Sequence, residues 1–124
     1  GERDACRVDA ELPEIYFTPD LKGYGWVFRK GGHVNVGLGR QDSQRLGEHV
    51  EDFLEFLRAR GRIARDLALP MKGHPYLLYG CAPRPLAAER ALLIGDAAGL
   101  AYPRSGEGIR PAVESGLMAA EVLA

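Results

Sequence analysis

Apolar and polar positions alternate along the first third of the chain. The run IYF at residues 15–17 is β-prone and is followed by the turn-forming Thr18-Pro19-Asp20. The alternation resumes at Tyr24–Phe28 and again at His33–Leu38. Gly31-Gly32 separates these two runs, which predicts a two-residue hairpin turn. The three runs are therefore expected to form part of an antiparallel sheet.

The next segment has the periodicity of an amphipathic helix. Its apolar residues recur three and four positions apart, whereas charged side chains occupy much of the rest. Asp42 or Ser43 is expected to cap its N-terminus, and Gly61 is expected to end it. The apolar positions are Leu46, Val50, Phe53, Leu54 and Leu57.

Short apolar runs then alternate with proline and glycine. Tyr76–Cys81 predicts a strand, the CAPRPL sequence that follows predicts an extended crossover, and Ala91–Ile94 predicts a buried strand. A helix of small residues is expected to begin near Arg110-Pro111, because proline is favoured in a first helical turn. The positions of this helix expected to face a sheet are Val113, Gly116, Leu117 and Ala120.

Composition narrows the class of protein. The 124 residues include 16 basic and 17 acidic side chains, which are interspersed, so no nucleic-acid partner is expected. The longest apolar runs are far shorter than the ~20 residues needed to span a bilayer, so we expect a cytoplasmic protein, with peripheral membrane contact left open. The two cysteines and three histidines form no metal-binding pattern, so no metal site is expected.

The segment between the last strand and the last helix carries the candidate chemistry. Gly95 lets a ligand approach the backbone closely, and the Asp96 carboxylate only accepts hydrogen bonds, which suits the hydroxyls of a sugar or ribityl chain. Gly106-Glu107-Gly108 leads into a helix N-terminus, where free N–H groups and the helix dipole favour negative charge. The alternative is an ordinary strand–turn–helix with a solvent-facing aspartate.

This run resembles the flavin-contacting motif of the para-hydroxybenzoate-hydroxylase-like FAD oxidoreductases. Within them it looks most like the geranylgeranyl reductase family, a branch that the Gly-Glu-Gly-Ile step and Glu114-Ser115-Gly116 favour. The resemblance implies that Asp96 binds the ribityl chain of FAD. The other flavin-binding residues that it implies are Gly95, Ala97, Pro103, Gly106, Glu107, Gly108 and Ile109.

A second motif supports the same family. The sequence YGWVFRK, from Tyr24 to Lys30, resembles the family's Tyr-x-Trp-x-Phe-Pro-Lys motif, with Arg29 in place of the proline. Tyr24, Trp26 and Phe28 would lie on one face of a strand, and an aromatic face suits an apolar, prenyl-like substrate. The alternative is that these aromatic residues belong to the core of the sheet.

The resemblance implies an FAD-dependent oxidoreductase. In that family hydride reaches FAD from NAD(P)H or another donor, and the reduced flavin then saturates an isoprenoid double bond. One alternative is a flavin monooxygenase or halogenase relative. Another is a non-catalytic fragment that binds no flavin by itself.

The resemblance covers about residues 14–123 but only the later part of the family's fold. The family's N-terminal βαβ unit with its GxGxxG sequence is not in this chain. We therefore expect an α+β fragment. Residues 1–88 would be part of a substrate domain with an antiparallel sheet and one helix. Residues 89–124 would be the last strand and helix of an FAD-binding α/β domain. Such a fragment is expected to bind FAD weakly or not at all, and to dimerise, swap elements or pair with another chain.

Overall fold

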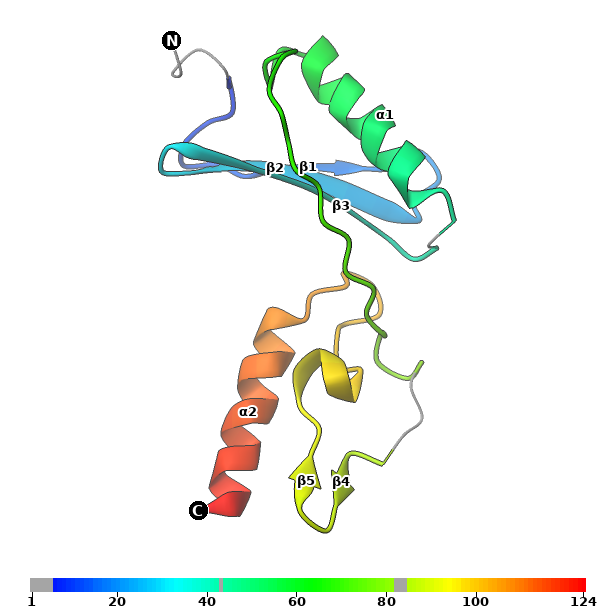
Figure 1. Ribbon diagram of the computed structural model, residues 1–124, viewed down its shortest axis with the longest axis vertical. Coiled ribbons are helices and arrows are strands. Elements are labelled where there is room, and N and C mark those ends of the chain that lie inside the picture. The colour runs from blue at the N-terminus through cyan, green and yellow to red at the C-terminus, as the bar shows by residue number, and fades with distance from the viewer. Residues whose placement is uncertain (1–5, 43, 82–84) are drawn as a thin grey trace. The chain divides into compact units, whose positions relative to one another are not determined.

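The chain is organised as two compact units. The structure is a computed structural model that describes residues 6–42, 44–81 and 85–124. Its units are Gly1–Met71 and Lys72–Ala124, and each is described by itself (Figure 1). The division falls earlier than the boundary near residue 88 expected from the sequence, so the segment that leads to the glycine-aspartate motif belongs to the same unit as the motif.

The first unit contains the expected antiparallel sheet. Its strands are β1 (Glu14–Phe17), β2 (Gly23–Lys30) and β3 (His33–Arg40), in the spatial order β1-β2-β3. Lys30 pairs with His33 across the predicted hairpin, where Gly31 has a φ of 59°. A left-handed backbone at this turn matches the twist of the two strands, which is why glycine suits the position.

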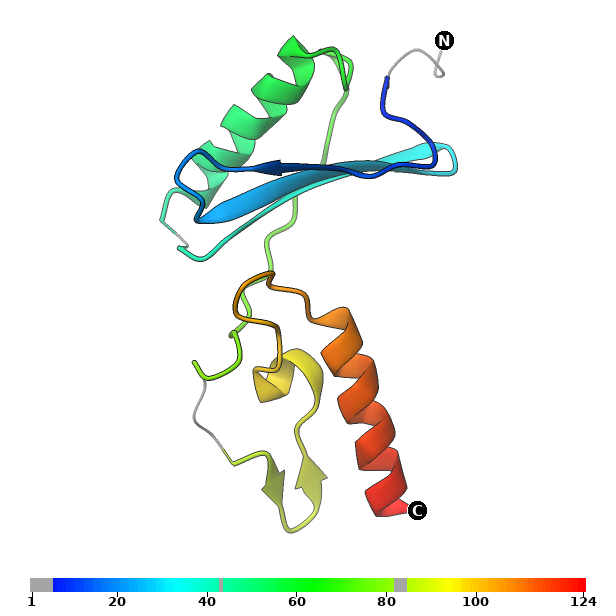
Figure 2. The same cartoon turned by 180° about the vertical axis from the view of Figure 1, so that it is seen from behind.

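Helix α1 (Leu46–Ala59) covers one face of this sheet (Figure 2). Val27 of β2 and Leu57 of α1 are fully buried, and Leu54 of α1 belongs to the same buried cluster. Val8 and Ile63 complete the buried cluster from the segments that flank the sheet and helix. Alternation along β2 therefore directs its odd-numbered positions toward α1 and its aromatic positions toward the opposite face.

The expected N-cap of α1 is wrong at Asp42. The helix begins at Leu46, and Arg45 occupies the N-cap position with a left-handed backbone and no side-chain cap. The Asp42 carboxylate instead pairs with Arg40, with 3.1 Å between Oδ1 and Nε. Ser43, the other expected cap, lies outside the described residues. At the far end Gly61 has a φ of 64° and donates to the Arg58 carbonyl, which confirms it as the terminator.

The second unit is a short hairpin followed by two helical segments. Strands β4 (Ala87–Ala88) and β5 (Ala91–Leu92) pair antiparallel, and the 3-10 helix η2 (Gly95–Ala98) follows them. The expectation of a buried strand over residues 91–94 is wrong beyond Leu92. It is also wrong about burial, because the side chains of residues 92–94 are 37–43% exposed.

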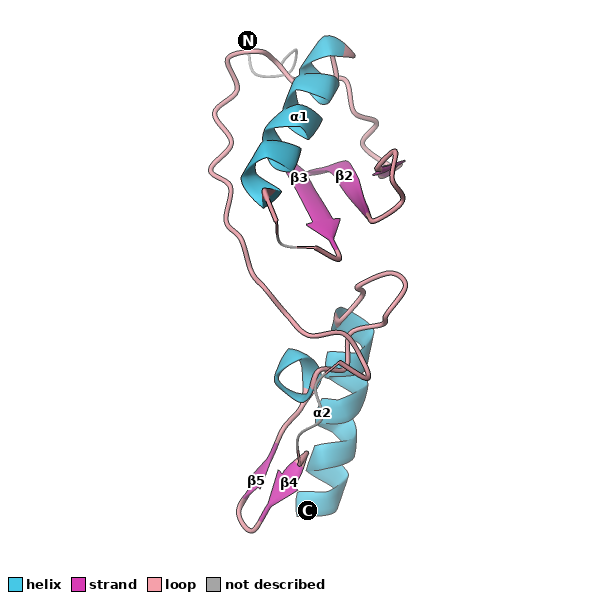
Figure 3. Cartoon of the chain, turned by 90° about the vertical axis from the view of Figure 1, so that its right-hand side faces the viewer, coloured by secondary structure: helices cyan, strands magenta, loops and turns pink. Residues whose placement is uncertain are grey.

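Two other expectations for this unit are only partly met. Tyr76–Cys81 forms no strand; its one ladder contact is an isolated parallel bridge between Leu78 and Ala101. Helix α2 (Ile109–Leu123) begins as predicted, with Pro111 in its first turn, and packs on η2 (Figure 3). Val113 and Leu117 were expected to face a sheet, but they are 58% and 61% exposed, and the sheet of this unit consists of two strands of two residues each.

No helix in the described part of the chain is both long enough and apolar enough to cross a membrane.

Candidate functional site

The glycine-aspartate turn is fixed to α2 by one hydroxyl. Gly95 is buried and has a φ of 55°, and its N–H donates to Ser115 Oγ at 3.0 Å. The same hydroxyl donates to the Pro111 carbonyl at 2.7 Å. A Cβ on Gly95 would lie 3.0 Å from Ala112 Cβ, so the turn and the helix are in close contact. Glycine is needed here both for its left-handed backbone and for this approach.

The Asp96 carboxylate lies at the N-terminus of α2. A Cβ on Gly108, the N-cap of that helix, would lie 2.8 Å from Asp96 Oδ1. The Asp96 side chain is 44% exposed, and among the described residues its carboxylate accepts no hydrogen bond. His74 Nε2 lies 3.6 Å from Oδ2. The site therefore presents a solvent-accessible acceptor beside a helix terminus that favours negative charge.

The loop before α2 is closed by its own backbone. Tyr102 N–H donates to the Glu107 carbonyl at 3.0 Å, and Gly106 N–H donates to the Tyr102 carbonyl at 2.8 Å. Glu107 Oε1 accepts the Arg110 N–H at 2.8 Å. The Glu107 side chain therefore caps α2, a role that the sequence did not suggest, and it uses one of the N–H groups expected to be free.

Most of the predicted flavin-binding residues come together in this unit. Gly95, Asp96 and Ala97 belong to η2, and residues 106–109 form the approach to α2 and its first residue. Pro103 lies instead beside an open pocket of about 300 Å³. Ile109 is 80% exposed. The other residues around that pocket are Tyr79, Leu100, Tyr102, Pro111, Glu114, Ser115 and Met118.

Sequence reasoning missed two side chains that contact these elements. Tyr76 donates its hydroxyl to the Gly106 carbonyl at 2.9 Å, and His74 stacks on the Tyr76 ring with centroids 6.3 Å apart. The sequence predicted a strand at the tyrosine and, for the histidine, only that it belongs to no metal-binding pattern. Because Tyr76 and Gly106 are thirty positions apart and His74 reaches Asp96 from a distant segment, no local periodicity could have identified these contacts.

The aromatic residues of β2 lie on the sheet face opposite α1. Tyr24 and Trp26 pack together with ring centroids 6.0 Å apart, and the Trp26 indole N–H donates to Asn35 Oδ1 at 2.8 Å. They are absent from the buried core, which Val27 joins from the other face. On the same open face lie Phe28 of β2 and two exposed apolar side chains of β1, Ile15 and Phe17.

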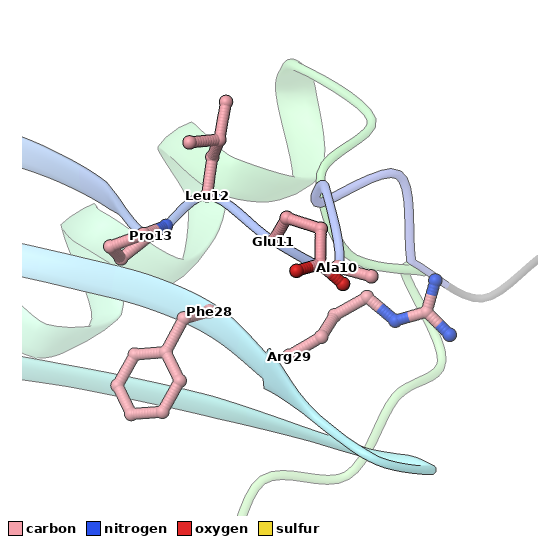
Figure 4. A pocket seen from close by; sticks show the side chains of 6 residues that line it. All are labelled: Ala10, Glu11, Leu12, Pro13, Phe28 and Arg29. Carbon is pink, nitrogen blue, oxygen red and sulfur yellow. The ribbon is translucent and has the colours of Figure 1, made fainter.

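A second open pocket, of about 320 Å³, lies beside the end of β2 (Figure 4). Arg29, which replaces the proline of the family motif, lines it together with Glu11 and Phe28, and the Phe28 ring points away from the arginine. The remaining lining residues are Ala10, Leu12 and Pro13.

Comparison with known proteins identifies relatives over nearly the whole chain. The chain is 36% identical over 121 residues to a digeranylgeranylglycerophospholipid reductase of Methanococcus vannielii, covering 94% of this chain and 30% of the relative. It is 35% identical over 123 residues to the protein of the same name from Methanocaldococcus jannaschii, covering 93% of this chain and 30% of that relative. A chloroplastic geranylgeranyl diphosphate reductase of Oryza sativa subsp. japonica is 38% identical over 128 residues. This match covers 97% of this chain and 26% of that relative.

The chain thus spans about a third or less of the length of these relatives. No family model matches it, and no solved structure does.

Proposed function

Because the chain belongs to the geranylgeranyl reductase family by similarity over nearly its whole length, we propose that the full-length protein is an FAD-dependent reductase of isoprenoid chains. The names of its relatives describe reductases of geranylgeranyl diphosphate and of digeranylgeranylglycerophospholipid. The two substrates share a long unsaturated isoprenoid chain. The proposal therefore concerns the reduction of double bonds in the isoprenoid chain. It leaves open whether that isoprenoid carries a diphosphate or a glycerophospholipid headgroup.

The observation that carries the proposal is the approach of Asp96 to the N-terminus of α2. Its carboxylate is an acceptor accessible to solvent, and Gly108 leaves no side chain between the carboxylate and the helix terminus. This donor and acceptor set fits a polyhydroxylated, anionic cofactor such as FAD. The fit supports the flavin assignment made from the motif.

In this proposal each part of the site has one task. Asp96 accepts hydrogen bonds from the ribityl hydroxyls, and Gly95 holds the carboxylate in place through its bond to Ser115. The N-terminus of α2 favours negative charge on the cofactor, with the Glu107 side chain capping the helix. When bound and reduced, FAD would supply a hydride to the substrate, and we propose that NAD(P)H or another donor reduces it.

The open aromatic face of β2 is proposed to bind the isoprenoid chain. Tyr24, Trp26 and Phe28 present large apolar side chains with few rotamers on the face that α1 leaves uncovered. Burying such a surface against an aliphatic chain removes apolar area from water, which lowers the free energy of the complex. We further propose that the first unit belongs to a substrate domain and the second to an FAD-binding domain.

Purification of the full-length protein tests the function directly. We expect a bound flavin, released by denaturation and identified as FAD by its mass. After anaerobic reduction, the holoenzyme is expected to convert a geranylgeranyl lipid into products that are heavier by one molecule of hydrogen per saturated bond. A protein that is purified without flavin and does not take up added FAD would overturn the proposal.

A further inference from the structure

We propose that Tyr76 is a positioning residue for the flavin loop, the backbone from Tyr102 to Gly108 that leads into α2. The inference rests on the proposed function, because the loop matters only if the site holds FAD. It adds to the family motif a residue that lies outside it in the sequence and reaches it in the structure.

The first contact joins Tyr76 to the flavin loop at Gly106. The Tyr76 hydroxyl donates to the Gly106 carbonyl at 2.9 Å, and Gly106 has a φ of 67°. A Cβ on Gly106 would lie 2.6 Å from that hydroxyl, whereas the next ring atom of Tyr76, Cζ, would be 3.6 Å away. The hydroxyl therefore packs directly on the glycine backbone, and glycine is required there for space as well as for conformation.

A second contact brings the same segment to the other half of the site. His74 stacks on the Tyr76 ring at an interplanar angle of 19°, and its Nε2 lies 3.6 Å from Asp96 Oδ2. The segment from His74 to Tyr76 thus touches both the carboxylate proposed to bind the ribityl chain and the loop proposed to line the flavin ring.

The segment is itself held against the motif. Leu78 forms a parallel bridge with Ala101, and Tyr79 N–H donates to the Ala101 carbonyl at 2.8 Å. Ala101, to which both contacts are made, is completely buried. Tyr76 therefore reaches Gly106 from an anchored backbone, as a positioning role requires.

The test measures FAD affinity of the full-length apoprotein by titration, following the change in flavin fluorescence. Tyr76→Phe keeps the ring and removes the hydroxyl, so we expect its dissociation constant to rise about threefold to tenfold, the range for one lost hydrogen bond. Tyr79→Phe is the matched control, because within the described residues the Tyr79 hydroxyl makes no hydrogen bond; we expect its affinity to be unchanged.

Gly106→Ala provides a readout that a general effect on folding would not give. We expect this substitution to weaken FAD binding more in the wild-type background than in Tyr76→Phe, because removing the hydroxyl clears the space that the new Cβ needs. Strictly additive effects would overturn the proposal, as would equal affinities of wild type and Tyr76→Phe. If Tyr76→Phe does not fold, Gly106→Ala with wild-type affinity overturns the proposal by itself. A wild-type protein that binds no FAD overturns both this inference and the proposed function. A wild-type protein that binds FAD, but whose affinity does not respond to these substitutions as expected, overturns this inference alone.

Discussion

The indole of Trp26 lies across the backbone of Gly37, its partner in the β2–β3 register. A Cβ on Gly37 would overlap the six-membered ring of the indole, and the indole N–H donates to Asn35, two residues from Gly37 along β3. The ring thus lies close to β3 because the facing position has no side chain. The Trp26 ring therefore lies against the open face of the sheet, beside the ring of Tyr24.

Gly37→Ala should therefore displace Trp26. We expect the substitution to destabilise the first unit by about 1–3 kcal/mol, the usual cost of forcing extra volume into a packed site. Trp26 is the only tryptophan of the chain, so its fluorescence during urea denaturation reports on this unit. The control is Gly32→Ala, where a Cβ would meet no atom within 4 Å. Equal midpoints for the two variants would contradict the packing argument.

Asp96→Ala should release flavin from the full-length protein without unfolding it. The hydrogen bonds of a charged acceptor are worth about 1.5–3 kcal/mol, so we expect FAD affinity to fall roughly tenfold to a hundredfold. Equilibrium dialysis measures the affinity, and circular dichroism checks the fold. Asp66→Ala is the control, since Asp66 makes no ion pair within the part of the chain that the structure describes. Undiminished flavin occupancy in Asp96→Ala would rule out the ribityl role.

Acid should weaken the first unit through a charge cluster at the end of β3. The buried Arg40 guanidinium bonds to Asp20 at 2.8 Å and to Asp42 at 3.1 Å, and these hydrogen bonds lower the pKa of both carboxyls. Each carboxyl has a lower pKa in the folded protein than its ordinary pKa of 3.8. The stabilisation from its ion pair is therefore complete above pH 3.8, and it is lost as the pH falls toward the pKa of the folded state.

Unfolding free energies measured from neutral pH down through this range check the effect. Asp20→Asn is expected to be less stable than wild type at neutral pH and to lose less stability on acidification, whereas Asp66→Asn should follow the wild-type curve. A parallel pH dependence in Asp20→Asn and wild type would show that the cluster does not couple to folding.

The 124-residue chain by itself should bind FAD weakly or not at all. The GxGxxG sequence that the resemblance implies for the cofactor's pyrophosphate is not in this sequence, so Asp96 and the N-terminus of α2 would have to hold FAD alone. Titration of the purified chain with FAD tests this. A yellow preparation with stoichiometric flavin would contradict it.

Local patterns predicted the sheet and α1 because their periods are set by the backbone. The hairpin at Gly31 and the helix terminator at Gly61 were identified because both positions need a left-handed backbone. Asp42 failed as a cap because Arg40 competes for the same carboxylate. Tyr76–Cys81 failed as a strand because pairing needs a partner, which local alternation cannot specify.

The candidate site was predicted in part. The motif placed Gly95, Asp96 and the loop before α2 in one site, and the structure brings them together. Neither local pattern nor motif indicated His74 or Tyr76, because their contacts depend on the path of the chain between distant segments. Their part in flavin binding, like that of the motif residues, stays a prediction until the titrations are done.

The Ser115 hydroxyl accepts a hydrogen bond from the Gly95 N–H and donates one to the Pro111 carbonyl. It therefore joins the glycine-aspartate turn to the first part of α2. The turn that carries Asp96 is therefore attached to α2 itself as well as lying beside the N-terminus of that helix. A substitution at Ser115 is therefore expected to act on the proposed cofactor site from the helix side, without changing any of the predicted flavin-binding residues.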